Sequence, residues 1–143
     1  MRNCSKEIKK IIDKKNFNKI LLITGKNSFG ACDGEILKEE VFKSKKYLIY
    51  FKNSEIPVYD ELIKITKKIQ SFKPDLILAI GGGTVIDYAK MSNVVDIRPD
   101  LPDLINNYSF PFNKRKSKLA VIPTTAGSGA EVTSNAVIYL KGI

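Results

Sequence analysis

The 143-residue chain contains no histidine, no tryptophan and only two cysteines. Without histidine, imidazole is excluded from every catalytic and metal-binding role. Cys4 and Cys32 form neither a CxxC pair nor a disulfide framework, so we expect two reduced thiols. The sequence also lacks an apolar run near the roughly 20 residues that span a bilayer, and its N-terminus lacks the apolar core of a signal peptide. These absences predict a cytoplasmic protein that does not contact membranes.

Basic residues outnumber acidic residues by 24 to 15, which gives a formal net charge of +9. The lysines are dispersed in pairs, and only "NKRKSK" (113–118) is a cluster, without interleaved aromatic residues. We therefore expect no nucleic-acid partner, although salt-dependent DNA binding would favour that alternative. The positive charge would instead attract an anionic cofactor or substrate.

Short apolar runs alternate with segments of helical periodicity. Strands covered on both faces are expected at 19–24, 47–51, 76–80 and 118–123, and helices at 5–15, 28–42, 58–72 and 84–95. In the first helix, Ile8, Ile11 and Ile12 should share one buried face. Residues 96–118 look irregular apart from a turn near Leu104, and 132–140 look β-rich. The alternation predicts one α/β domain over residues 1–143, a Rossmann-like parallel sheet flanked by helices with a β-hairpin-like C-terminal extension.

Three loops rich in glycine, serine and threonine follow predicted strands. They are "TGKNSF" after the first strand, "GGGTVID" after the third and "PTTAGSG" after the fourth. Because ligands of parallel sheets bind beyond the carboxyl ends of the strands, this convergence predicts a ligand site at that edge.

The glycine triplet Gly81, Gly82 and Gly83 suits a phosphate, although Ile86 replaces the third glycine of G-x-G-x-x-G. Glycine permits positive φ and close approach to a ligand, and the N-terminus of the following helix favours a pyrophosphate. A tight turn that binds nothing is the alternative. Thr84 should be the N-cap, with Asp87 in a loose capping box; Asp87 could equally serve the cap alone or contact a cofactor.

The loop after the fourth strand could hydrogen-bond a ribose or an adenine edge. Its hydroxyl groups belong to Thr124, Thr125, Ser128 and Thr133. The same composition is common in solvated surface loops, so the loop alone decides nothing.

Two stretches together, "AIGGGTVIDYAK" (79–90) and "LAVIPTTAGSGAEVTSNAVIY" (119–139), closely resemble motifs of the iron-containing (group III) alcohol dehydrogenases. This family belongs to the dehydroquinate synthase-like superfamily. Thr84 replaces the usual serine of the first motif, and Ser128 and Ala130 are small substitutions in the second. The resemblance implies an NAD(P)-binding N-terminal domain. "PTTAGSGAEVT" favours the alcohol dehydrogenase branch over dehydroquinate synthase, which uses NAD transiently on a sugar phosphate.

The resemblance also implies roles for individual residues. Pyrophosphate would lie over Gly82, Gly83 and Thr84, and adenosine and ribose would contact Thr124 and Thr125. The nicotinamide side would be lined by Thr133, Asn135 and Tyr139, although Asn135 and Tyr139 could equally face solvent.

Cofactor preference can be read at Gly25. Family members that prefer NAD tend to carry an acidic residue there, which accepts hydrogen bonds from the ribose 2′-hydroxyl. Glycine followed by Lys26 and Ser28 would instead tolerate or attract a 2′-phosphate. We therefore expect NADP(H) to be preferred over NAD(H).

The family's Fe²⁺ or Zn²⁺ is held by one aspartate and three histidines of a helical C-terminal domain, which this sequence lacks. We therefore expect a fragment of a longer two-domain protein, the NAD(P)-binding half of a metal-dependent alcohol dehydrogenase or aldehyde reductase, inactive alone. Its substrate would be a small alcohol or aldehyde, anionic ones included, and uncovered apolar surface would favour a homodimer. The alternative is a stand-alone nucleotide-binding or regulatory module without catalysis.

Overall fold

Four parallel strands form a single sheet in this computed structural model, which describes residues 4–109, 114–127 and 129–140. The strand order is β2-β1-β3-β4, and the strands are β1 (Lys19–Thr24), β2 (Lys46–Phe51), β3 (Leu76–Gly81) and β4 (Lys118–Pro123). The chain moves outward in one direction from β1 to β2 and in the other from β3 to β4. The strand order therefore reverses between β1 and β3, where open α/β sheets bind ligands.

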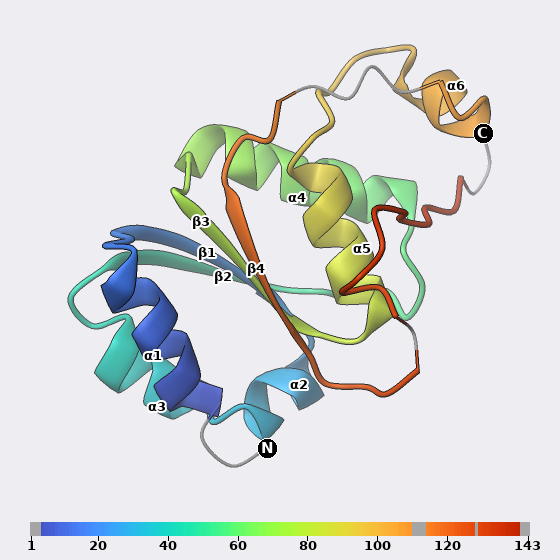
Figure 1. Cartoon of the computed structure of the whole chain (residues 1–143). Helices are drawn as coiled ribbons and strands as arrows, with labels where there is room; N and C mark the ends of the chain where they lie inside the picture. The colour runs from blue at the N-terminus through green and yellow to red at the C-terminus, as the bar shows by residue number, and fades with distance from the viewer. Residues whose placement is uncertain (1–3, 110–113, 128, 141–143) are drawn as a thin grey trace.

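Helices cover both faces of the sheet (Figure 1). One face packs against α1 (Cys4–Lys14), α2 (Lys26–Ala31) and the π-helical turn η1 (Leu37–Val41), and the short α3 (Gly34–Ile36) lies on the same side of the sheet (Figure 1). The other face packs against α4 (Tyr59–Phe72), α5 (Gly83–Ser92) and the start of the short α6 (Leu101–Asn106). Side chains of β1 alternate between the two cores, with Leu22 on the first face and Leu21 on the second. The α/β architecture expected from the sequence is confirmed.

The N-terminal helix corrects two expectations. Ile8 and Ile12 are fully buried, but Ile11 is 40% exposed, because the buried stripe runs from Cys4 through Ile8 to Ile12. The two cysteines are joined in a disulfide, with their Cα atoms 5.5 Å apart, so the expectation of reduced thiols was wrong. Packing of α1 on the sheet face shared with α2 and η1 brings together two cysteines that the sequence separates widely.

The second expected helix is divided into α2, α3 and η1. The division occurs at Cys32 and Asp33, where Asp33 adopts a left-handed φ of 53°. The edge strands β2 and β4 are largely half-buried rather than fully buried, because each has only one neighbouring strand.

The expected hairpin-like extension is also wrong over the described residues 129–140. They contribute one isolated bridge, between Tyr139 and Val58. The Tyr139 N–H donates to Pro57 O (2.7 Å), and the Tyr59 N–H donates to Tyr139 O (3.1 Å). The segment thus pairs with the residues that lead into α4 instead of folding back on itself. Within the described ranges, no helix is long and apolar enough to cross a membrane.

Candidate functional site

A cleft of about 680 Å³ opens at the carboxyl ends of the strands. The loops after all four strands contribute to it, and it lies where the strand order reverses. Its lining residues are Gly25, Lys26, Asn27, Ser28, Lys52, Asn53, Gly82, Gly83, Thr84 and Thr125. The tertiary structure therefore brings together many of the residues that the sequence predicted for a cofactor site.

Gly81 and Gly82 are required for close packing rather than for positive φ. In the described part of the chain, glycines with positive φ occur only at Gly127 and Gly129. A Cβ at Gly81 would lie 2.6 Å from Val85 Cγ2, and a Cβ at Gly82 would lie 2.9 Å from Thr125 Oγ1. Residues larger than glycine would therefore force neighbouring groups to move.

The N-cap of helix α5 lies two residues before the position expected from the sequence. Its N-cap is Gly82, with φ −83° and ψ −168°, so the expectation that Thr84 caps the helix was wrong. Thr84 lies inside the first turn, and its hydroxyl donates to Glu55 O at 2.8 Å. Asp87 consequently lies beyond the first turn, where a capping-box role is excluded by its distance along the helix from Gly82.

Hydrogen bonds join the loops that frame the cleft. The Thr124 N–H donates to Gly81 O (3.0 Å), and the hydroxyls of Thr124 and Ser28 lie 3.1 Å apart. The buried Thr24 hydroxyl donates to Ile80 O at 2.8 Å. The ends of β1, β3 and β4 are thus held in one arrangement before any ligand binds.

Lys52 and Asn53 line the cleft but were missed by the sequence analysis. Both follow β2, so the rule that selected the other three strand ends could have found them. Their loop is anchored by Glu61, a carboxylate only 5% exposed. The Asn53 N–H donates to Glu61 Oε1 (2.6 Å), and the Ser54 N–H donates to Oε2 (2.9 Å).

Two tyrosines complete this anchor. The hydroxyl of Tyr50 donates to Glu61 Oε1 (3.2 Å), and that of Tyr88 donates to Oε2 (3.1 Å). Tyr88 also accepts a hydrogen bond from the Val58 N–H at 2.8 Å. Burial by itself would raise the pKa of Glu61, but the hydrogen bonds from Ser54, Asn53 and Tyr88 outweigh it and lower that pKa below its ordinary value. Burial, reinforced by Glu61, raises the pKa of Tyr50.

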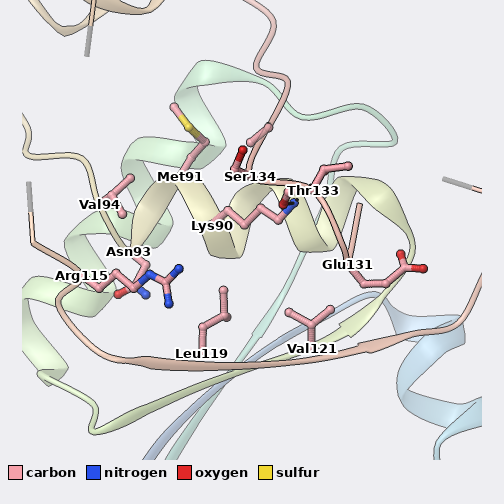
Figure 2. Close-up of a pocket in the computed structure, with 11 residues that line it drawn as sticks. Lys90, Met91, Asn93, Val94, Arg115, Leu119, Val121, Glu131, Thr133 and Ser134 are labelled. Atoms are coloured by element: carbon pink, nitrogen blue, oxygen red, sulfur yellow. Dashed lines mark hydrogen bonds between the residues drawn. The ribbon is translucent and has the colours of Figure 1, made fainter. Parts of the chain in front are cut away.

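Thr133 lines a second cavity, of about 580 Å³, between α5, β4 and the C-terminal segment (residues 129–140) (Figure 2). Here the Lys90 ammonium donates to Thr133 O (2.7 Å) and Asn135 O (3.0 Å), and also to Ala130 O. Lys90 therefore holds the C-terminal segment against α5. This role was not recognised from the sequence.

Asp87 and Tyr139 also stand outside the lining of the cleft. Burial raises the pKa of the half-buried Asp87, although the Val137 N–H and Lys90 act in the opposite direction. Tyr139 pairs through its backbone with residues before α4. Ser128 lies outside the described residues.

The residues that the structure describes do not form a site for a catalytic metal ion. No histidine is present in the sequence, and the described ranges contain no cluster of three or more histidine, cysteine, aspartate or glutamate side chains that could hold one. No chemical step through Fe²⁺ or Zn²⁺ is therefore assigned to these residues.

Comparison with known proteins agrees with this arrangement. The family model described as iron-containing alcohol dehydrogenase matches residues 1–142. An alcohol dehydrogenase of Thermococcus barophilus is 39% identical over 88 residues, which cover 57% of this chain and 23% of that protein. The NADPH-dependent butanol dehydrogenase of Clostridium saccharobutylicum is 33% identical over 84 residues, covering 57% of this chain and 22% of that protein.

A solved structure shares the fold. The sulfoacetaldehyde reductase of Bifidobacterium kashiwanohense, in complex with NAD⁺, aligns with a TM-score of 0.77 at 21% identity over 92% of this chain and 35% of that one. The chain thus spans about a third or less of the length of these proteins. With almost its whole length matched by the family model, the chain belongs to the iron-containing alcohol dehydrogenase family and corresponds to its N-terminal portion.

Proposed function

We propose that this chain is the NAD(P)-binding part of a metal-dependent alcohol dehydrogenase or aldehyde reductase. In such an enzyme, hydride passes between the nicotinamide and a small alcohol or aldehyde. The observation that carries the proposal is the cleft at the switch point of the sheet, with Gly82 at the N-terminus of α5. A helix N-terminus without a side chain at its cap can receive a pyrophosphate closely.

The polar groups around the cleft support this assignment. Gly82, Gly83 and Thr84 would meet the pyrophosphate through their backbone, because the Thr84 hydroxyl already donates to Glu55 O. Thr124 and Thr125 follow the neighbouring strand and would hydrogen-bond the ribose. The bonds that join these loops would orient the dinucleotide without reorganisation.

We further propose that NADP(H) is preferred over NAD(H). Gly25 offers no carboxylate to a ribose, and Lys26 and Ser28 follow it in the cleft lining. Both cofactors occur among related proteins: the butanol dehydrogenase is NADPH-dependent, and the sulfoacetaldehyde reductase was solved in complex with NAD⁺. The basic surroundings of this cleft favour the cofactor with the additional phosphate.

The substrate would be a small alcohol or aldehyde, and an anionic aldehyde would suit the net charge of +9. The sulfoacetaldehyde reductase is named for an anionic aldehyde. The catalytic Fe²⁺ or Zn²⁺, which polarises the carbonyl, would require ligands that this sequence does not supply. The 143-residue chain should therefore bind cofactor without catalysing hydride transfer.

Calorimetric titration with NADPH and NADH tests the binding function. We expect saturable binding of NADPH, and failure to bind either cofactor would contradict the proposal. An assay with NADPH, short aldehydes and added Fe²⁺ or Zn²⁺ should show no turnover; robust turnover would show that the chain needs no further metal ligands. Binding without turnover also fits a stand-alone nucleotide-binding module, and histidines encoded downstream of Ile143 would separate the two.

A further inference from the structure

We propose that Lys52 selects NADP(H) in this cleft by binding the phosphate on the 2′ position of the adenosine ribose. The inference rests on the proposed function and adds Lys52 to the residues that set its cofactor specificity. Lys52 directly follows β2 and lines the cleft. A Cβ placed at Gly25 would lie 3.6 Å from Lys52 Cε, so the lysine stem passes beside the end of β1 at a position that carries no side chain.

Lys52 is held in place at both its backbone and its side chain. The backbone N–H of Lys52 donates to Thr24 O at 2.9 Å, which continues the pairing of β2 with β1. Its Nζ donates to Ser54 O at 2.9 Å. Ser54 is in turn bound to the buried Glu61 through both its N–H and its hydroxyl. Since an ammonium carries three N–H groups, a phosphate oxygen can accept from the same nitrogen while the anchor stays intact.

Charge around Lys52 favours an additional phosphate. Among the described residues that line the cleft, two are lysines, Lys26 and Lys52, and none is aspartate or glutamate. Glu61 lies behind the loop, where backbone N–H groups and hydroxyls occupy its oxygens. A 2′-phosphate would therefore meet positive charge without an opposing carboxylate in the cleft wall.

The strand order gives the separation that this role needs. Gly82 follows β3, which pairs with β1, and β1 pairs on its other side with β2, which Lys52 follows. Two inter-strand spacings, about 10 Å, thus separate the proposed pyrophosphate position from Lys52. An adenosine ribose between the two positions can direct its 2′ substituent toward the end of β2. In dinucleotide-binding folds, charged residues near this position commonly discriminate between a hydroxyl and a phosphate.

Dissociation constants of NADPH and NADH for the unaltered chain and for Lys52→Gln provide the test. We expect Lys52→Gln to weaken NADPH binding about tenfold or more, as for loss of a charge-assisted hydrogen bond, and NADH binding less than about threefold. Lys52→Arg, which keeps the charge, should retain the preference. Lys46→Gln removes the same charge from the opposite end of β2 and should change neither constant.

Each outcome decides the proposal. Unchanged NADPH affinity in Lys52→Gln, or an equal loss for both cofactors, would overturn it, since an equal loss places Lys52 at the shared pyrophosphate. If the variant fails to fold, competition in the unaltered chain can still overturn the inference: adenosine 2′,5′-bisphosphate should displace NADPH at least about tenfold better than adenosine 5′-phosphate, and equal displacement would show that no residue of the cleft binds the 2′-phosphate. Failure of the unaltered chain to bind either dinucleotide would overturn the proposed function itself.

Discussion

Gly82 lies so close to Thr125 that a Cβ on the glycine would stand 2.9 Å from the threonine Oγ1. This contact joins the loop after β3 to the loop after β4 at the mouth of the cleft. The same backbone is where we propose that a pyrophosphate binds. The absence of a side chain at Gly82 therefore allows both the packing of the loops after β3 and β4 and the approach of the proposed pyrophosphate.

Gly82→Ala should weaken NADPH binding by about tenfold or more, because the methyl group enters the cradle and displaces Thr125. Fluorescence titration of NADPH would measure the change. Gly30→Ala is the matched control, since a Cβ at Gly30 meets nothing within 4 Å in helix α2. The control should bind normally and gain up to about 1 kcal/mol of stability, as alanine replaces glycine in a helix. Normal binding by Gly82→Ala would contradict the proposed pyrophosphate site at the backbone of Gly82, Gly83 and Thr84.

Gly81→Ala should instead destabilise the fold, by about 1–3 kcal/mol of unfolding free energy, through overpacking. Its Cβ would lie 2.6 Å from Val85 Cγ2 and 2.8 Å from Val85 Cβ, and both residues are buried. Urea unfolding measures the loss. The double variant with Val85→Ala should recover part of it, because the truncated side chain makes room. Additive losses in the double variant would show that the two positions do not compete for space.

Glu61→Gln should lower the unfolding free energy by about 1–3 kcal/mol, because the amide NH₂ cannot accept from donors that now face a carboxylate. The donors include the N–H groups of Asn53 and Ser54 and the hydroxyl of Tyr88. Chemical denaturation would measure the difference. Glu40→Gln is the control, since Glu40 is exposed, and it should change stability by less than about 0.5 kcal/mol. Equal effects of the two substitutions would contradict the anchoring role.

The pH dependence of stability should reveal the same carboxylate. The folded-state pKa of Glu61 lies below its ordinary value of 4.5, so its contribution is complete above pH 4.5 and is lost as pH falls through the lower folded value. The unaltered chain should therefore lose more stability than Glu61→Gln below pH 4.5. The raised pKa of Asp87 acts with the opposite sign but is common to both proteins, so it cancels in the difference. Parallel stability curves from pH 6 to 3 would contradict this.

Reduction of the Cys4–Cys32 disulfide should cost about 3 kcal/mol of stability. The bridge closes a loop with a sequence separation of 28 and restrains the unfolded chain, so dithiothreitol should shift the urea midpoint downward. The double variant Cys4→Ser with Cys32→Ser should not respond to the reductant. Two titratable thiols in the denatured, unreduced protein would show instead that the bridge is not formed.

Strands and helices could be read from the sequence because their signals are local. Apolar runs marked β1 and β3 closely, and the spacing of Leu62, Ile65 and Ile69 marked the buried face of α4. Ile11 was misplaced because two adjacent isoleucines allowed the stripe to be drawn on either side. Residues 132–140 have the composition of a strand, but the Tyr139 N–H donates to Pro57 O instead of pairing within its own segment.

Part of the site could also be predicted, because the residues of each loop are a local signal in the sequence. The sequence alone determined that glycine- and hydroxyl-rich loops follow apolar runs typical of parallel strands, that these 143 residues supply no imidazole, and that two motifs resemble one family. Only the tertiary structure decided which loops meet: it placed Lys52 beside Gly25, tied Thr124 to Ser28 and joined two distant cysteines. These contacts depend on strand order and helix packing, which local patterns of hydrophobicity do not encode.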